Sequence, residues 1–166
     1  GYIVLILIGS FMIHGSSNPA VSFVGYNLFV LPLGLILSYI INAYNAAGYS
    51  DIVTTAFAIT ALVTFVMMAI SSIFPYFFLS MGRTLGVTLL VTVILEVIMF
   101  FAGAALGIFD YLVVLIFCGY VGYDWARANA CAKTVDNAVD CAAELYIDIV
   151  NLFVRILSIL SRANRN

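Results

Sequence analysis

Long stretches without charge dominate this chain and determine the solvent in which it can fold. Of its 166 residues, 65% are hydrophobic and only 8% are charged, whereas soluble domains contain about 45–50% apolar and about 25% charged residues. The apolar stretches are continuous rather than alternating, which favours membrane-spanning helices over a lipid-facing β-barrel. We therefore expect an all-α integral membrane protein that contacts the lipid bilayer and forms one transmembrane domain over residues 1–166.

Breaks rich in Gly, Pro, Asn, Ser or charge divide the chain into six apolar segments, and short loops make consecutive helices antiparallel neighbours. The breaks fall at 14–19, 42–51, 74–84, 103–110 and 133–137. Helices are therefore expected near 2–14, 20–42, 52–74, 84–103, 109–132 and 138–160. The first segment is shorter than the ~20 residues that a span requires. Because the chain does not begin with Met, we expect further protein before Gly1.

Charge and cysteine usage narrow the function classes. A net charge of −2 without a basic patch argues against nucleic-acid binding. Cys118, Cys131 and Cys141 lie in or near apolar segments and lack CxxC or Cys/His spacing. We interpret them as small apolar residues, with redox chemistry at Cys131 and Cys141 as the alternative.

Ionisable side chains inside the apolar segments are the candidate functional residues. Each costs at least ~2.5–3.5 kcal/mol on insertion scales, so such residues usually face the bundle interior and mark a pathway. Glu96, Asp124 and Asp148 are the acids that lie within apolar segments. The polar residues of the last segment also fall within an arc of about 120° on a helix: Asp136, Asp140, Glu144, Asp148, Asn151, Arg155, Ser158 and Arg162. We expect this polar face to be turned into the bundle, and a helix lying on the membrane surface is the alternative.

Asp124 and Asp148 are equally distant from the turn between the last two segments. Residues equidistant from the turn of an antiparallel hairpin lie at the same depth, and the midpoint of 124 and 148 is residue 136, within the KTVDN turn. Each aspartate is then ~18 Å of helix from the turn. We therefore expect the two carboxyl groups to face each other.

The remaining charged residues are expected to pair more loosely. Arg127 can pair with Asp124 at i,i+3, and Arg155 can neutralise part of the polar face through Asn151 or water. Glu96 has no evident partner and is expected to be protonated. Ion pairing without any function is the alternative interpretation of this whole group.

The expected aspartate pair suits both proton sensing and weak cation binding. Two carboxyl groups a few ångströms apart in a low-dielectric bundle do not easily both ionise. At higher pH both are charged and repel each other or attract a cation, whereas at lower pH a shared proton holds the helices together. Ca²⁺ takes about 6–8 oxygens, so Asp124 and Asp148 alone form a weak Ca²⁺ site, to which Glu144 and Asn151 can add oxygens. Loose binding of this kind is what a conducting path needs.

Several segments resemble a known family. GYVGYDWARA, followed by AAELYIDIVNLFVRIL, is similar to the C-terminal signature of the transmembrane Bax inhibitor motif family. In that signature a Tyr-Asp pair ends one helix and an LY-x-D-x-x-N-L-F run occupies the next. PLGLILS and IVTTAFAITALVTF also resemble the family, so the similarity spans most of the chain.

The resemblance implies a seven-helix bundle with the last helix at its centre, of which six helices are visible here and the first is missing. It also implies a pH-sensitive Ca²⁺ leak across a membrane, in bacteria the plasma membrane, and suppression of cell death in eukaryotes. The paired aspartates of the family match Asp124 and Asp148. Bacterial relatives can carry a basic cluster after the helix matching 2–14, which pairs with the aspartates in the closed state. FMIHGSSNP has no Lys or Arg, so His14 or Arg127 is the candidate substitute.

These observations favour a pH-sensitive cation leak channel that transports Ca²⁺ and needs no cofactor. Asp124 and Asp148 are the predicted proton sensor and ion ligands, and the auxiliary polar path comprises Asp140, Glu144, Asn151, Arg155, Arg127 and Glu96. A regulatory protein that acts on membrane partners, such as a quality-control protease, is the second hypothesis. Intramembrane aspartyl proteases also use two aspartates, but their GxGD and PAL motifs are absent from this sequence, so we expect no enzyme.

Overall fold

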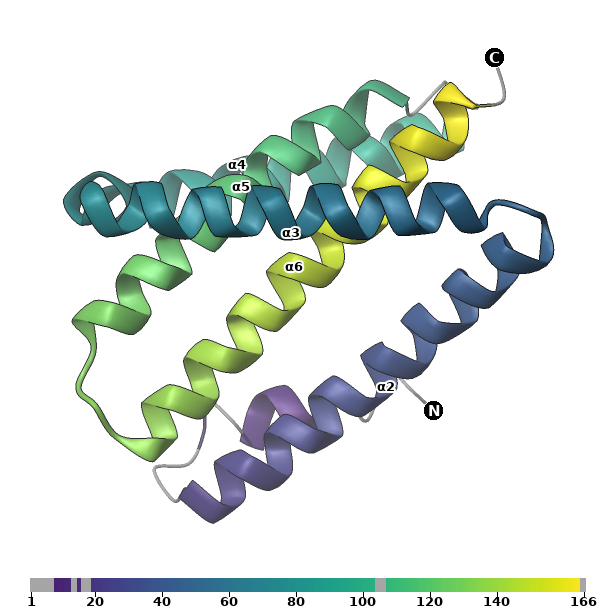
Figure 1. Cartoon of the computed structure of the whole chain (residues 1–166). Coiled ribbons are helices and arrows are strands. Elements are labelled where there is room, and N and C mark those ends of the chain that lie inside the picture. Colours follow the sequence, from purple (N-terminus) through teal and green to yellow (C-terminus); the bar gives the residue numbers. More distant parts are fainter. Residues whose placement is uncertain (1–7, 13–14, 16–18, 104–106, 165–166) are drawn as a thin grey trace.

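The computed structural model describes residues 8–12, 15, 19–103 and 107–164, and every regular element within these ranges is a helix (Figure 1). Residues 8–12 are helical. They are followed by α2 (Pro19–Ala46), α3 (Ser50–Ile73), α4 (Pro75–Phe101), α5 (Gly107–Ala130) and α6 (Val135–Ala163). The prediction of an all-α protein is confirmed. Most of the helix expected at 2–14 lies outside the described residues.

Two helices begin three or more residues earlier than the sequence pattern indicates. α4 begins at Pro75 rather than at 84, because proline is well tolerated in the first turn of a helix, where its missing N–H leaves no hydrogen bond unmade. Phe74 alone separates α3 from α4. α6 begins at Val135 rather than at 138 because Thr134 caps it: the Thr134 hydroxyl accepts a hydrogen bond of 3.2 Å from the Asn137 backbone N–H.

Four of the described helices are long and apolar enough to cross a membrane: Ala20–Ala46, Ser50–Ile73, Pro75–Phe101 and Gly107–Ala130. Large apolar side chains point outward from them, including Phe65, Phe77 and Phe101. Such surfaces are stable against lipid and not against water. The chain is therefore an integral membrane protein.

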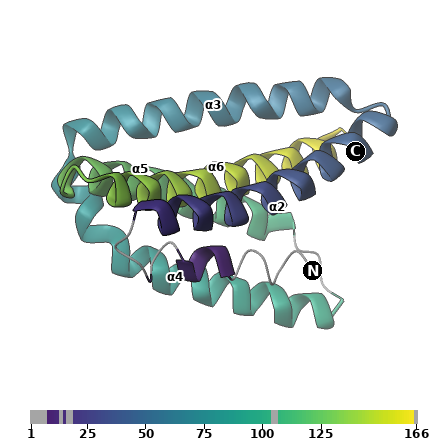
Figure 2. The ribbon, with the colours of Figure 1, turned by 90° about the horizontal axis from the view of Figure 1, so that it is seen from below.

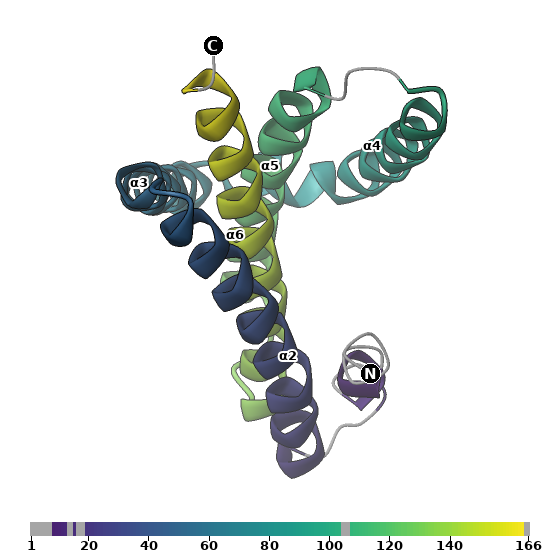
Figure 3. The ribbon, with the colours of Figure 1, turned by 90° about the vertical axis from the view of Figure 1, so that its right-hand side faces the viewer.

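α6 lies at the centre of the described helices. It packs against α2, α3 and α5, and Figure 3 shows it between α3 and α5 with α2 alongside. Seen from below, α2, α5 and α6 form a middle layer with α3 on one side and α4 on the other (Figure 2). Leu152, Phe153 and Leu157 on α6 are buried, so the apolar side of this helix supplies the core. The central position predicted for the last helix is confirmed.

Small residues allow α5 to fit closely between α3 and α4. A Cβ atom on Gly122 would collide with the ring of Phe78 on α4. On the other side, the Ser71 hydroxyl of α3 donates a hydrogen bond of 2.5 Å to the Gly122 carbonyl oxygen. The indole N–H of Trp125 donates to the Ser72 hydroxyl at 2.9 Å. These contacts fix the rotation of α5 and therefore the direction in which its acidic side chains point.

Candidate functional site

Asp124 of α5 and Asp148 of α6 face each other across the last helical hairpin. Both residues are buried, with 6% and 4% of their surface exposed, and both line the same cavity. The Oδ2 atom of Asp148 is buried without a hydrogen-bond partner among the described residues. The structure brings these two aspartates together between α5 and α6, where the hairpin spacing predicts them, and so gives the bundle a buried acidic pair.

A cavity of about 360 Å³ opens beside the aspartate pair. Its polar side chains come from Tyr120, Tyr123, Asp124, Arg127, Glu144, Asp148 and Asn151. Asn151 donates one side-chain N–H to the Ile147 carbonyl oxygen at 2.8 Å, and this bond leaves its side-chain oxygen able to accept or coordinate. Asp140, which the sequence grouped with these residues, does not line the cavity. The arrangement gathers oxygen atoms from both helices of the hairpin around one cavity.

Arg127 pairs with Glu144 on α6 in a salt bridge. The sequence predicts instead that Arg127 pairs with Asp124 on its own helix. The hairpin explains the difference: 127 and 144 are nearly equidistant from the turn, so their long side chains meet between the two helices. Neither Asp124 nor Asp148 forms a salt bridge with Lys or Arg in the described ranges.

A second charged cluster lies further along α6, where Arg155 joins three helices. Its guanidinium donates to both carboxylate oxygens of Glu96 on α4, at 2.7 and 3.0 Å, and to Oδ1 of Asp110 on α5 at 2.7 Å. Ser158 donates to Oδ2 of Asp110 at 3.2 Å, and Arg162 forms a salt bridge with the same carboxylate. The expectation that Glu96 lacks a partner is wrong, because α4 places it within reach of Arg155. Arg155 therefore neutralises Glu96 and Asp110 and forms no salt bridge with the aspartate pair in the described ranges.

Asp110 is the site residue that the sequence reasoning missed. It is 4% exposed, and the sequence pattern assigns it to the break at 103–110. A signal for it was nevertheless present, since the midpoint of Asp110 and Arg162 is residue 136, as it is for Asp124 and Asp148. Equal distance from the turn therefore predicts both the Asp124–Asp148 pair and the Asp110–Arg162 pair.

The polar residues of α6 thus belong to three successive groups of side chains along the helix. The Arg127–Glu144 pair lies nearest the turn, the aspartate pair follows, and the cluster around Arg155 lies beyond it. Formal charges in that cluster cancel, because two arginines face two carboxylates. Among the described residues no group of three or more His, Cys, Asp or Glu side chains could hold a metal ion, so the aspartate pair is a weak ligand set. His14, the other candidate substitute for a basic cluster, lies outside the described residues.

Comparison with known proteins agrees with this architecture. The family model of inhibitors of apoptosis-promoting Bax1, Bax1-I, matches residues 1–166. Protein LIFEGUARD 3 of Arabidopsis thaliana is 29% identical over 116 residues, which are 69% of this chain and 46% of that protein. The modulator of FtsH protease YccA of Escherichia coli strain K12 is 27% identical over 171 residues, covering 99% of this chain and 77% of YccA. No solved structure matches the chain.

The E. coli relative is also described as the inner membrane protein YccA in a second strain. That location agrees with the four apolar helices, which make this chain an integral membrane protein. The family model matches all 166 residues, so the assignment to a family does not depend on the aspartate motif alone. The chain therefore belongs to the Bax1-I family of integral membrane proteins.

Proposed function

We propose that the protein is a pH-sensitive cation leak channel in which Asp124 and Asp148 bind both protons and the transported ion, Ca²⁺. The observation that carries the proposal is the buried carboxyl pair beside a cavity of about 360 Å³. A charged side chain within a span is costly unless it serves a pathway or a relay. Two such side chains at one level form the narrow, oxygen-lined point that a cation path requires.

The sign of the pH dependence follows from the pair itself. Two neighbouring carboxylates repel each other when both are ionised and attract a divalent cation. When a proton is shared, it joins the two carboxyl groups and holds α5 against α6. We therefore expect Ca²⁺ leak to increase as the pH rises and to fall as the pair takes up a proton.

The rest of the polar face is compatible with cation passage. The Arg155 cluster is neutral overall because its arginines are paired with Glu96 and Asp110, so it presents no net positive barrier. Near the turn, Arg127 is paired with Glu144 and can change partner to an ionised Asp124 one turn away. Such a change of partner would take the place of the basic cluster expected in bacterial relatives.

Flux into liposomes tests the proposal. The purified protein is reconstituted with a Ca²⁺ indicator inside the vesicles, and leak is measured between about pH 6 and pH 8. Asp124→Asn and Asp148→Asn are expected to reduce the leak and flatten its pH dependence. Asp51→Asn is the matched control, because Asp51 is an exposed aspartate at the start of α3. Wild-type flux and pH dependence retained in both site variants would refute the proposal.

A second candidate function is regulation of a membrane-bound protease. It is favoured by the relative YccA, whose name describes it as a modulator of FtsH protease and which aligns with 99% of this chain. The names of the relatives describe regulation rather than catalysis. Affinity purification from bacterial membranes in mild detergent distinguishes the two functions. Recovery of an FtsH-type protease, together with no flux from the isolated protein, would favour regulation over the channel.

A further inference from the structure

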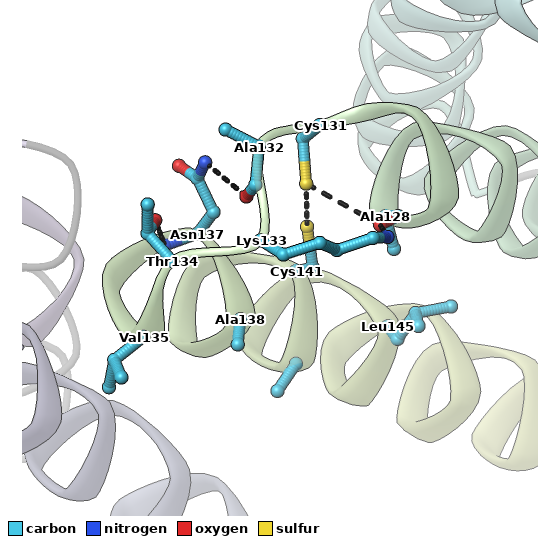
Figure 4. A pocket seen from close by; sticks show the side chains of 11 residues that line it. Ala128, Cys131, Ala132, Lys133, Thr134, Val135, Asn137, Ala138, Cys141 and Leu145 are labelled. Carbon is cyan, nitrogen blue, oxygen red and sulfur yellow. Dashed lines mark hydrogen bonds between the residues drawn. The ribbon is translucent and has the colours of Figure 1, made fainter.

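Two cysteines face each other across the turn that joins α5 to α6. The Sγ atoms of Cys131 and Cys141 are 3.9 Å apart, and both residues line a cavity of about 550 Å³ at this end of the hairpin. Figure 4 shows the two sulfur atoms pointing toward each other, Cys131 from the turn and Cys141 from α6. Both are free thiols.

Cys131 and Cys141 are equally distant from the turn, as the paired charged residues of the hairpin are. The midpoint of 131 and 141 is residue 136, as it is for Asp124 and Asp148. Each cysteine is seven residues from the aspartate on its side of the turn, which corresponds to about 10.5 Å of helix. The Arg127–Glu144 salt bridge lies between these two levels. The thiols therefore meet for the same geometric reason as the carboxyl groups.

Hydrogen bonds brace the turn and keep the thiols near each other. The Lys133 ammonium donates to the carbonyl oxygens of Ala128 and Asn129 at 3.0 and 3.2 Å. Asn137 donates its side-chain N–H to the Ala132 carbonyl oxygen at 2.8 Å. A bond between the two sulfurs requires them to approach from 3.9 Å to about 2.05 Å.

We propose that Cys131 and Cys141 form a redox site, a dithiol that closes reversibly to a disulfide and ties the end of α5 to the first turns of α6. This inference does not depend on ion transport. It assigns the two cysteines a chemical role, whereas Cys118 lies further back along α5 and remains a free thiol.

The oxidant is a low-molecular-weight disulfide, and the reaction consists of two thiol–disulfide exchanges. Cys131 is half-buried and Cys141 is buried, so the Cys131 thiolate attacks a sulfur of the oxidant and releases one thiol. The Cys141 thiolate then attacks Sγ of Cys131 and releases the second thiol. The protein loses two electrons and two protons, and the two released thiols carry both. Reduction by an external dithiol reverses the sequence.

Counting free thiols tests the site directly in the intact protein. The reduced protein and the protein treated with oxidised glutathione are unfolded and labelled with a maleimide, and the mass of the whole chain is measured. Reduced chains are expected to take three labels, one for each free cysteine. Oxidised chains are expected to take one label, on Cys118, and to lose the mass of two hydrogen atoms while remaining monomeric on a non-reducing gel.

Three variants identify the atoms involved. Cys118→Ser keeps the pair and is expected to take no label after oxidation. Cys141→Ser cannot complete the second exchange and is expected to retain glutathione on Cys131. Cys131→Ser is expected to keep both remaining thiols, because Cys141 is buried. Three labels on oxidised wild-type protein, or disulfides that join two chains, would overturn the proposal.

Discussion

Replacing Arg155 with Met should destabilise the bundle, because it removes the cation that lies between the buried carboxylate of Asp110 and the partly buried carboxylate of Glu96. Arg155 donates three hydrogen bonds of 2.7 to 3.0 Å to Glu96 and Asp110. The side chains of these acids are only 16% and 6% exposed. Asp110 keeps Ser158 and Arg162 as partners, whereas the Glu96 carboxylate keeps no other ion pair or hydrogen bond within the described part of the chain.

Removing one partner of a buried ion pair costs about 3–5 kcal/mol. The lower end of that range applies here, because the Arg155 side chain is 30% exposed and partly hydrated. For a chain of this size each kcal/mol corresponds to about 2–4 °C in melting temperature. Arg155→Met should therefore lower the melting temperature by about 6–12 °C, a shift estimated from ~3 kcal/mol.

Thermal unfolding in detergent, followed by tryptophan fluorescence, measures this shift. Trp125 is the single tryptophan of the chain, and its hydrogen bond to Ser72 makes it sensitive to the packing of α3 against α5. Arg83→Met is the matched control, because Arg83 is exposed on α4 and forms no salt bridge among the described residues. A double-mutant cycle with Glu96→Gln isolates the interaction between Arg155 and Glu96. Equal melting temperatures for Arg155→Met and Arg83→Met, or purely additive effects in the cycle, would refute the reasoning.

Two further predictions concern packing and capping and use the same unfolding assay. Gly122→Ala should destabilise the protein by about 1–3 kcal/mol, because the added methyl group would overlap the Phe78 ring. Gly86→Ala is the control, since its nearest neighbour would be 3.8 Å away, and equal losses in the two variants would contradict the packing explanation. Thr134→Ala should cost about 1 kcal/mol by removing the cap that accepts the Asn137 N–H. Thr134→Ser should retain most of that stability, and a serine variant as unstable as the alanine variant would argue against the cap.

Distance from the turn between α5 and α6, which can be counted in the sequence, accounts for much of the candidate site. Asp124 and Asp148 meet because α5 and α6 form an antiparallel hairpin, and their common distance from the turn is visible in the numbering. The same rule extends to Arg127 with Glu144 and to Asp110 with Arg162. The sequence prediction does not include those two pairs, because they join charges that lie near the ends of the apolar runs or on different helices.

Contacts between distant segments follow no such rule. Glu96 reaches Arg155 because α5 fits closely against α4, and that fit depends on Gly122 accommodating Phe78. The sequence shows that each of these residues is small, aromatic or charged, but not which side of α4 faces α5. Four nearly uniform apolar helices offer many similar ways to pack, so hydrophobicity alone cannot select one.

The sequence by itself therefore determined the membrane environment, the helices, the polar face of α6 and the facing aspartates. Each of these follows from composition, from helical periodicity or from a single short turn. Only the tertiary structure decided that Arg155 neutralises Glu96 and Asp110 rather than the aspartate pair. It also decided that Gly122 of α5 lies against the Phe78 ring of α4. The physical reason is that a charge or a thiol interacts with whatever side chain packing brings within a few ångströms, and packing between helices depends on the shapes of all of them together.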